Sequence, residues 1–99
     1  MIIEWDSDKA EKNVAKHHVY FEDAAQIFLD EARYIELDYE HSDEEIRYKT
    51  IGRVGKILFV VYTKRDEATR LISARKATKK ERMKYYVSQN AYLPWDEID

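Results

Sequence analysis

Cysteine is absent from this chain of 99 residues, and glycine (two) and proline (one) are scarce. Without cysteine the chain can form neither a disulfide framework nor a thiolate metal site, which suits a protein of the cytoplasm. The three histidines, His17, His18 and His41, lack the spacing of zinc ligands, so we expect no metal and no other cofactor. Few glycines and prolines, together with 44% hydrophobic residues, predict a folded chain and argue against disorder.

Long apolar runs are also missing, since none approaches the ~20 residues that span a bilayer. The N-terminal stretch MIIEWDSDK has neither the basic start nor the apolar core of a signal peptide, so we expect a cytoplasmic protein with no membrane partner. The length fits one domain, which we place at residues 1–90, and we assign residues 91–99 to an acidic C-terminal tail.

The net charge of −3 conceals two segments of opposite charge. Residues 22–45 contain ten acidic side chains and one arginine, whereas residues 46–90 contain thirteen basic side chains and three acidic ones. The basic side chains are dense in TRLISARKATKKER, residues 69–82. Such a division predicts a polyanionic partner for the basic segment. The alternative is that the two segments neutralise each other within the fold.

Hydrophobic periodicity predicts a short strand, two helices, four strands and a final helix. The first strand is IIEW, and a helix begins after it at Asp6 or Ser7, with FEDAAQIFLD forming the second helix. Runs rich in β-branched and aromatic residues predict strands at residues 33–37, 46–54, 56–63 and 69–76, joined by hairpin turns, with ILFVV in the central strand, covered on both faces. Thr78 and Glu81 match a capping box, so the last helix begins at residue 79 and ends near Asn90.

The order β-α-α-β-β-β-β-α predicts an α+β fold with the helices packed on one antiparallel sheet. Lys79 and Lys80 lie in the first turn of the last helix, where the backbone already favours an anion. Arg75 precedes them closely enough to join such a site, and Arg65 and Arg70 flank the second hairpin turn. Aromatic residues near these cations supply stacking surfaces for bases, as single-stranded nucleic acid requires: Tyr62, Tyr85 and Tyr86.

Metal-free cleavage of RNA requires a base for the 2′-hydroxyl proton, cations for the developing phosphorane charge and an acid for the leaving oxygen. Arginine and lysine meet the second need, and His17 is the candidate for proton transfer. His17 lies on the less polar face of its helix, so a structural role is the alternative. We interpret His41, in the acidic sequence YEHSDEE, as a surface or turn residue, and Glu81 as a capping partner.

An ordered set of segments resembles the BrnT toxins, a family of ribonuclease toxins with a RelE-like fold in type II toxin-antitoxin systems. The matching segments are EWDSDKAEKNVAKH, FEDAAQIFLD, Asp38 and His41 with Arg47, VVYTKR, RLISARKA, and Glu81-Arg82. The resemblance implies a metal-independent endoribonuclease that cuts RNA and inhibits translation. It also implies a cognate BrnA-type antitoxin that alone contacts operator DNA, and a toxin-antitoxin heterotetramer.

The resemblance carries catalytic roles onto Arg65, Arg75 and His17. RNA-binding roles fall on further residues of the same basic surface: Lys16, Tyr62, Arg70, Lys79, Lys80 and Tyr86. Two positions depart from the family pattern, because His18 replaces a C-cap glycine and Tyr20 replaces an N-cap serine, each at a cost of about 1 kcal/mol. Two other functions stay open for the same basic face: a non-catalytic nucleic-acid-binding module and a protein-interaction module.

Overall fold

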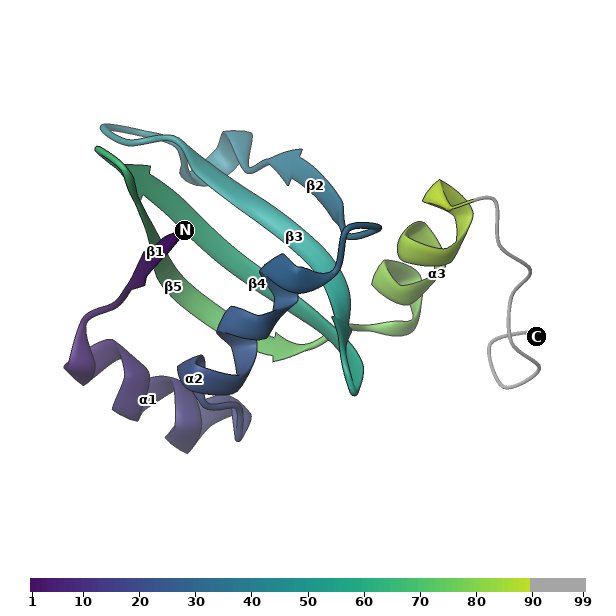
Figure 1. The fold of residues 1–99 in the computed structure, drawn as a ribbon, viewed down its shortest axis with the longest axis horizontal. Coiled ribbons are helices and arrows are strands. Elements are labelled where there is room, and N and C mark those ends of the chain that lie inside the picture. Colours follow the sequence, from purple (N-terminus) through teal and green to yellow (C-terminus); the bar gives the residue numbers. More distant parts are fainter. Residues whose placement is uncertain (90–99) are drawn as a thin grey trace.

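The computed structural model describes residues 1–89 and confirms the predicted order of elements (Figure 1). The helices are α1 (Ser7–His17), α2 (Phe21–Ala24) and α3 (Lys79–Ser88), with short 3₁₀ helices η1 (Ala25–Leu29) and η2 (Tyr39–His41). The strands are β1 (Ile2–Glu4), β2 (Tyr34–Leu37), β3 (Arg47–Val54), β4 (Lys56–Arg65) and β5 (Ala68–Lys76). The tail assigned to residues 91–99 lies outside the described residues.

The five strands form one sheet in the order β1-β5-β4-β3-β2. The meander from β2 to β5 is antiparallel, as predicted, but β1 pairs parallel with β5, so the sheet is mixed. β4 is the central strand, in agreement with the continuous apolar run ILFVV. Gly55 and Asp66 adopt the left-handed conformation, at φ 72° and 54°, in the two tight turns on either side of β4.

Helix α1 has the predicted start and an unusual end. The side chain of Asp6 accepts a hydrogen bond from the amide of Asp8, which caps the first turn. At the other end His18 is left-handed, with φ 59° and ψ 31°, and its amide donates to the carbonyl of Val14. The helix therefore uses the left-handed C-cap that the family pattern implies, but with a residue that has a Cβ atom.

Asn13 ties α1 to the edge of the sheet. Its side-chain amide donates to the carbonyl of Ala74 (2.8 Å), and its oxygen accepts from the Ala74 amide (3.0 Å). Because β1 pairs only with residues 68–70 of β5, the backbone of Ala74 has no strand partner on that side. The buried asparagine takes the place of that partner and closes the exposed edge.

The predicted second helix is shorter than its pattern indicates, because the α-helix ends at Ala24 and the chain continues as the 3₁₀ helix η1. Tyr20 supplies no side-chain cap, and the tighter turn lays Ile27 directly over β3. A Cβ atom at Gly52 would lie 2.7 Å from Cγ1 of Ile27. Glycine at this position therefore allows the close approach of η1 to the sheet.

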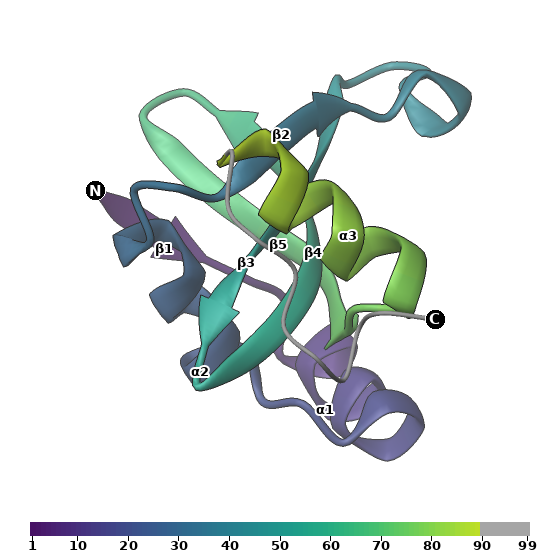
Figure 2. The ribbon, with the colours of Figure 1, turned by 90° about the vertical axis from the view of Figure 1, so that its right-hand side faces the viewer.

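The helices cover both faces of the sheet. On one face the core contains Phe21, Ala24 and Ile27, which pack against buried residues of β4 and β5. On the opposite face Tyr85 packs with Ile51 and Ile57, so α3 lies across the other side of the sheet (Figure 2). None of the helices in residues 1–89 combines the length and apolar character needed to cross a membrane.

Candidate active site on the open face of the sheet

Strand pairing gathers cations on the sheet face that carries α3. Residues paired directly across neighbouring strands point to the same side, so three rows of side chains share this face. The first row is Glu4, Arg70, Thr63 and Arg47; the second is Ser73, Val61, Lys49 and Glu36; the third is Arg75, Phe59, Ile51 and Tyr34. Helix α3 packs on the third row, and we call the first two rows the open face.

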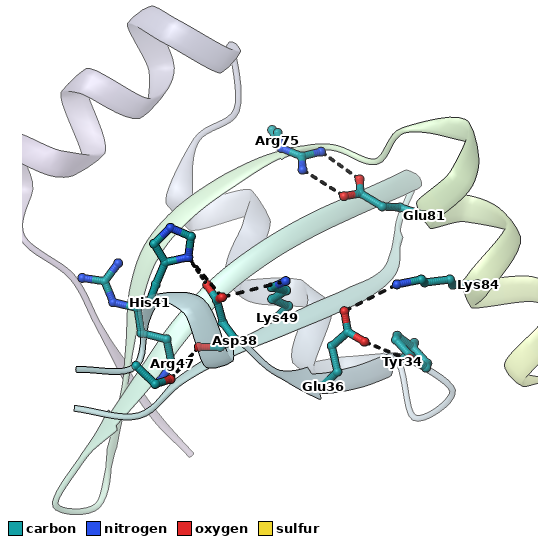
Figure 3. Close-up of polar contacts among 10 residues, drawn as sticks. Tyr34, Glu36, Asp38, His41, Arg47, Lys49, Arg75, Glu81 and Lys84 are labelled. Atoms are coloured by element: carbon teal, nitrogen blue, oxygen red, sulfur yellow. Dashed lines mark hydrogen bonds and ion pairs between the residues drawn. The ribbon is translucent and has the colours of Figure 1, made fainter. Parts of the chain in front are cut away.

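A histidine and a buried carboxylate meet beside the open face (Figure 3). The Nδ1 atom of His41 lies 3.1 Å and 3.0 Å from the two carboxylate oxygens of Asp38. The Asp38 side chain is 6% exposed, whereas that of His41 is 62% exposed. A carboxylate on Nδ1 favours the tautomer in which Nδ1 carries the proton and Nε2 is unprotonated. The exposed Nε2 is thereby oriented to accept a proton.

The loop after β2 holds this pair in place through its backbone. The Asp38 amide donates to the carbonyl of Arg47 (2.9 Å), which extends the β2–β3 pairing by one residue. The Ser42 hydroxyl donates to the Asp38 carbonyl (2.7 Å) and accepts from the Arg47 amide (2.9 Å). Hydrogen bonds therefore fix the loop that carries His41 on both sides of this residue, at Asp38 and at Ser42.

Two arginines share an open hollow with His41. Arg47 and Arg65 line this hollow of about 530 Å³, together with the acidic residues at positions 43–45. Arg65 forms an exposed ion pair with Glu45 at 3.2 Å, and the hydrogen bond from Arg65 lowers the pKa of the Glu45 carboxyl. Arg65 can move toward a phosphate at the exposed face of His41, because an exposed ion pair is weak.

Lys49 connects His41 to the rest of the open face. Its ammonium lies 3.8 Å from Asp38 and is partly exposed. Along the same row Glu36 pairs with Lys84 of α3 at 3.6 Å and accepts a hydrogen bond from the Tyr34 hydroxyl, which raises the pKa of Tyr34. These contacts fix the flank of α3 that faces the site (Figure 3).

The structure places Arg75 on the same face and pairs its guanidinium with Glu81. The two terminal nitrogens bind the two oxygens of Glu81 at 2.8 Å and 2.9 Å, and the group stacks 4.2 Å above the ring of Phe59. Burial raises the pKa of Glu81, but hydrogen bonds from Arg75 and Thr78 outweigh it, and the pKa is lowered. Arg75 therefore joins β5 to α3, and a phosphate has to compete with Glu81 for it.

His17 lies apart from the hollow that His41 lines. It is the last residue of α1, and its pKa is lowered by partial burial and by the neighbouring charges of Lys16, Arg75 and His18. Arg75 and Arg65 stand near opposite ends of β5, about 23 Å apart along the strand. The three residues predicted to be catalytic thus do not form one cluster: Arg65 accompanies His41, and Arg75 accompanies His17.

The structure contradicts the prediction that Tyr62 binds RNA. Tyr62 is 3% exposed, and the rings of Tyr48 and Phe28 pack against it at 5.3 Å and 5.1 Å. The strand alternation directs it into the core beneath η1, so no base can stack on it. Tyr85 is buried as well, and its hydroxyl donates to Asp30.

The remaining predicted residues occupy two places. Arg70 lies on the open face and is paired with Glu4 of β1. Lys79 and Lys80 begin α3, next to the Arg75–Glu81 pair, and Lys16 is exposed on α1. Tyr86 is half-buried against the core under α3, and its hydroxyl accepts a hydrogen bond from Arg53 at 3.3 Å.

Sequence reasoning missed the part of the site around His41. The prediction treated His41 as a surface or turn residue. The structure shows that His41 is exposed, and that it is also hydrogen-bonded to the buried carboxylate of Asp38. Two signals were available in the sequence: the spacing of Asp38 and His41 by three residues, and basic side chains at every second position of a strand in Arg47 and Lys49. The second pattern indicates one cationic face.

The sequence and the fold are similar to those of a known family of proteins. A family model described as ribonuclease toxin, BrnT, of type II toxin-antitoxin system matches residues 5–81. The crystal structure of the Brucella abortus ribonuclease toxin BrnT is similar over 79% of this chain and 97% of that chain, with 29% sequence identity and a TM-score of 0.60. No curated protein matches the sequence. With the match extending across most of its length, the chain belongs to the BrnT family of ribonuclease toxins of type II toxin-antitoxin systems.

Proposed function

We propose that the protein is a metal-independent endoribonuclease that cuts RNA on the open face of its sheet and thereby inhibits translation in the cytoplasm. Family membership supports the ribonuclease activity. The observation that carries the assignment of the site is the His41–Asp38 pair, which presents an oriented imidazole beside Arg47 and Arg65. These groups supply proton transfer and positive charge from the chain itself.

In the proposed reaction, Nε2 of His41 removes the proton from a ribose 2′-hydroxyl. The O2′–P bond forms as the P–O5′ bond breaks, which leaves a 2′,3′-cyclic phosphate on one fragment. The leaving 5′ oxygen takes a proton from water and becomes a 5′-hydroxyl, and the imidazolium returns its proton to solvent. Asp38 stabilises the imidazolium that forms in this step.

Positive charge has two roles in this proposal. Arg47 and Arg65 stabilise the phosphorane charge at the cut, since both line the hollow that contains His41. Arg70, Arg75, Lys79 and Lys80 bind phosphates on either side of the cut, together with Lys16 near the end of α1. His17 is the alternative base, and it would cut RNA beside Arg75 and not in the hollow that His41 lines.

The protein partner in this proposal is a BrnA-type antitoxin. Membership in a type II toxin-antitoxin family implies an antitoxin, and we infer that it forms a heterotetramer with the toxin and alone contacts operator DNA.

Incubation of the antitoxin-free protein with a purified messenger RNA, with EDTA present and ribosomes absent, tests the proposed function. We expect discrete fragments that end in 2′,3′-cyclic phosphate and 5′-hydroxyl groups. RNA that stays intact under these conditions, but is bound, would contradict metal-independent cleavage without ribosomes, in favour of ribosome-dependent cleavage or of a non-catalytic nucleic-acid-binding module. Intact and unbound RNA, with tight binding of the antitoxin, would favour a protein-interaction module.

A further inference from the structure

A second cationic pocket lies on the flank of α3 away from Glu36 and Lys84, between α3 and the β3–β4 hairpin. It encloses about 320 Å³, and the polar side chains that line it are Arg53, Lys56, Lys76, Arg82 and Tyr86. No carboxylate is among its lining residues in the described part of the chain, although the whole chain has more acidic than basic residues. A pocket whose described lining has four cations and no carboxylate favours an anion.

Two of the cations are held in position. The guanidinium of Arg53 donates to the Tyr86 hydroxyl, and this hydrogen bond raises the pKa of Arg53. Arg82 donates to the carbonyl of Ala77 at 3.0 Å. Tyr86 in turn packs edge-on against the buried Tyr85, with the ring centres 5.5 Å apart. The pocket therefore has a preformed polar wall and an aromatic side.

The other two cations are available for a ligand. Lys56 and Lys76 are exposed, and neither has an ion-pair partner within residues 1–89. They belong to different strands, β4 and β5, whose pairing brings Lys76 opposite Leu58 and close to the start of β4. Two lysines that converge on one pocket repel each other unless an anion lies between them.

Further cations lie along the chain between the open face and this pocket. β5 carries Arg75 and then Lys76, and Lys79 and Lys80 follow at the start of α3. At the other end, Arg47 of the His41 hollow and Arg53 of this pocket are six residues apart on β3, which corresponds to about 20 Å. That separation is about six stacked nucleotides of a single strand.

We propose that this pocket is a second phosphate subsite, which binds a phosphodiester of single-stranded RNA several nucleotides away from the cut. The inference rests on the proposed function and specifies how the RNA lies: from the hollow at His41, past the N-terminus of α3, into the pocket. Cations and an aromatic ring together fit a nucleotide better than an acidic peptide, because Tyr86 offers stacking as well as charge pairing.

The test compares a Lys56→Gln, Lys76→Gln double variant with a Lys9→Gln, Lys12→Gln control. The control makes the same charge change at exposed positions of α1. Cleavage and binding are measured at two or more salt concentrations, with RNAs of about three and about twelve nucleotides, since only the longer one spans both places. We expect the first double variant to bind the longer RNA about tenfold more weakly than the control. The slope of log binding constant against log salt concentration should also be smaller in magnitude by about 1.4.

Three results would overturn the inference. The first is equal binding of the longer RNA by the two double variants. The second is an equal loss of binding for the short and the long RNA, which would indicate a general charge effect. A third contrary result is weaker antitoxin binding with unchanged RNA binding, which would assign the pocket to an acidic protein segment. Because binding is measured separately from cleavage, an RNA that binds with the expected length dependence but stays uncut would contradict the proposed nuclease activity and support the subsite.

Discussion

The guanidinium of Arg75 binds both carboxylate oxygens of Glu81 and so connects the end of β5 to the first turn of α3. Glu81 also accepts a hydrogen bond from the Thr78 amide at 2.8 Å, within a complete capping box. Arg75 therefore has a structural role whether or not it contacts RNA. Loss of toxicity on its substitution is ambiguous unless stability is measured in parallel.

Arg75→Ala is expected to lower the free energy of unfolding by about 2 kcal/mol, because it leaves a mostly buried carboxylate without its main partner. Urea denaturation measures this change, and Lys64→Ala, at an exposed position of the same sheet, is the control. If both variants unfold at the wild-type urea concentration, the Arg75–Glu81 pair does not stabilise the fold.

Stability should decrease as the pH falls below the usual carboxyl range. Burial raises the pKa values of Glu81 and Asp30, but hydrogen bonds outweigh burial in both cases and lower them from 4.5 and 3.8. The unfolded chain then binds more protons than the folded one in this window. The contribution is complete above the unfolded values and is lost as the pH falls through the lower folded values.

Urea denaturation between pH 7 and pH 3 measures this dependence. A Glu81→Gln variant, which cannot titrate at that position, should be less stable at neutral pH and should show a shallower decline toward acid. A decline as steep as that of the wild-type protein would show that Glu81 does not contribute to it.

His18→Gly should stabilise the protein by about 1 kcal/mol. His18 is left-handed at the C-cap of α1, with φ 59°, and glycine adopts this conformation without the Cβ penalty. Thermal unfolding measures the gain, with His17→Gly as the contrasting variant, because His17 is still helical and glycine there should destabilise. Equal effects of the two substitutions would contradict the assignment of the cap.

Asp38→Asn should slow RNA cleavage about a hundredfold while RNA binding is preserved. The amide keeps the shape of the buried side chain, but it cannot stabilise an imidazolium at His41. The cleavage rate is measured at saturating RNA across a range of pH, and the folded fraction is checked by circular dichroism. An unchanged rate in a folded variant would exclude Asp38 from proton transfer.

Much of the fold could be predicted from the sequence because local patterns specify it. The alternating runs placed the strands to within one or two residues of β2 to β5, and the capping box located the start of α3 at residue 79. The parallel pairing of β1 could not be predicted, because its partner lies more than sixty residues away in the chain. The placement of α3 on the other face of the sheet from α2 could not be predicted either, because both faces of β4 are apolar and either could be covered by each helix.

The site could be predicted only in part. The sequence identified the cations, but not that Glu4, Glu45 and Glu81 lie beside three of the arginines. These partners come from other elements, so their positions follow from the tertiary fold and not from spacing along the chain. His41 was not predicted as a site residue, because η2 lies in an acidic loop that resembles ordinary surface.

The most direct measurement compares the rates at which wild type, His41→Ala and His17→Ala cleave one purified RNA in EDTA. The account predicts that His41→Ala loses about a hundredfold or more in rate, while His17→Ala retains activity near that of the wild type. A folded His41→Ala variant that cleaves at the wild-type rate would contradict the account, and loss of activity in His17→Ala alone would place the reaction beside Arg75.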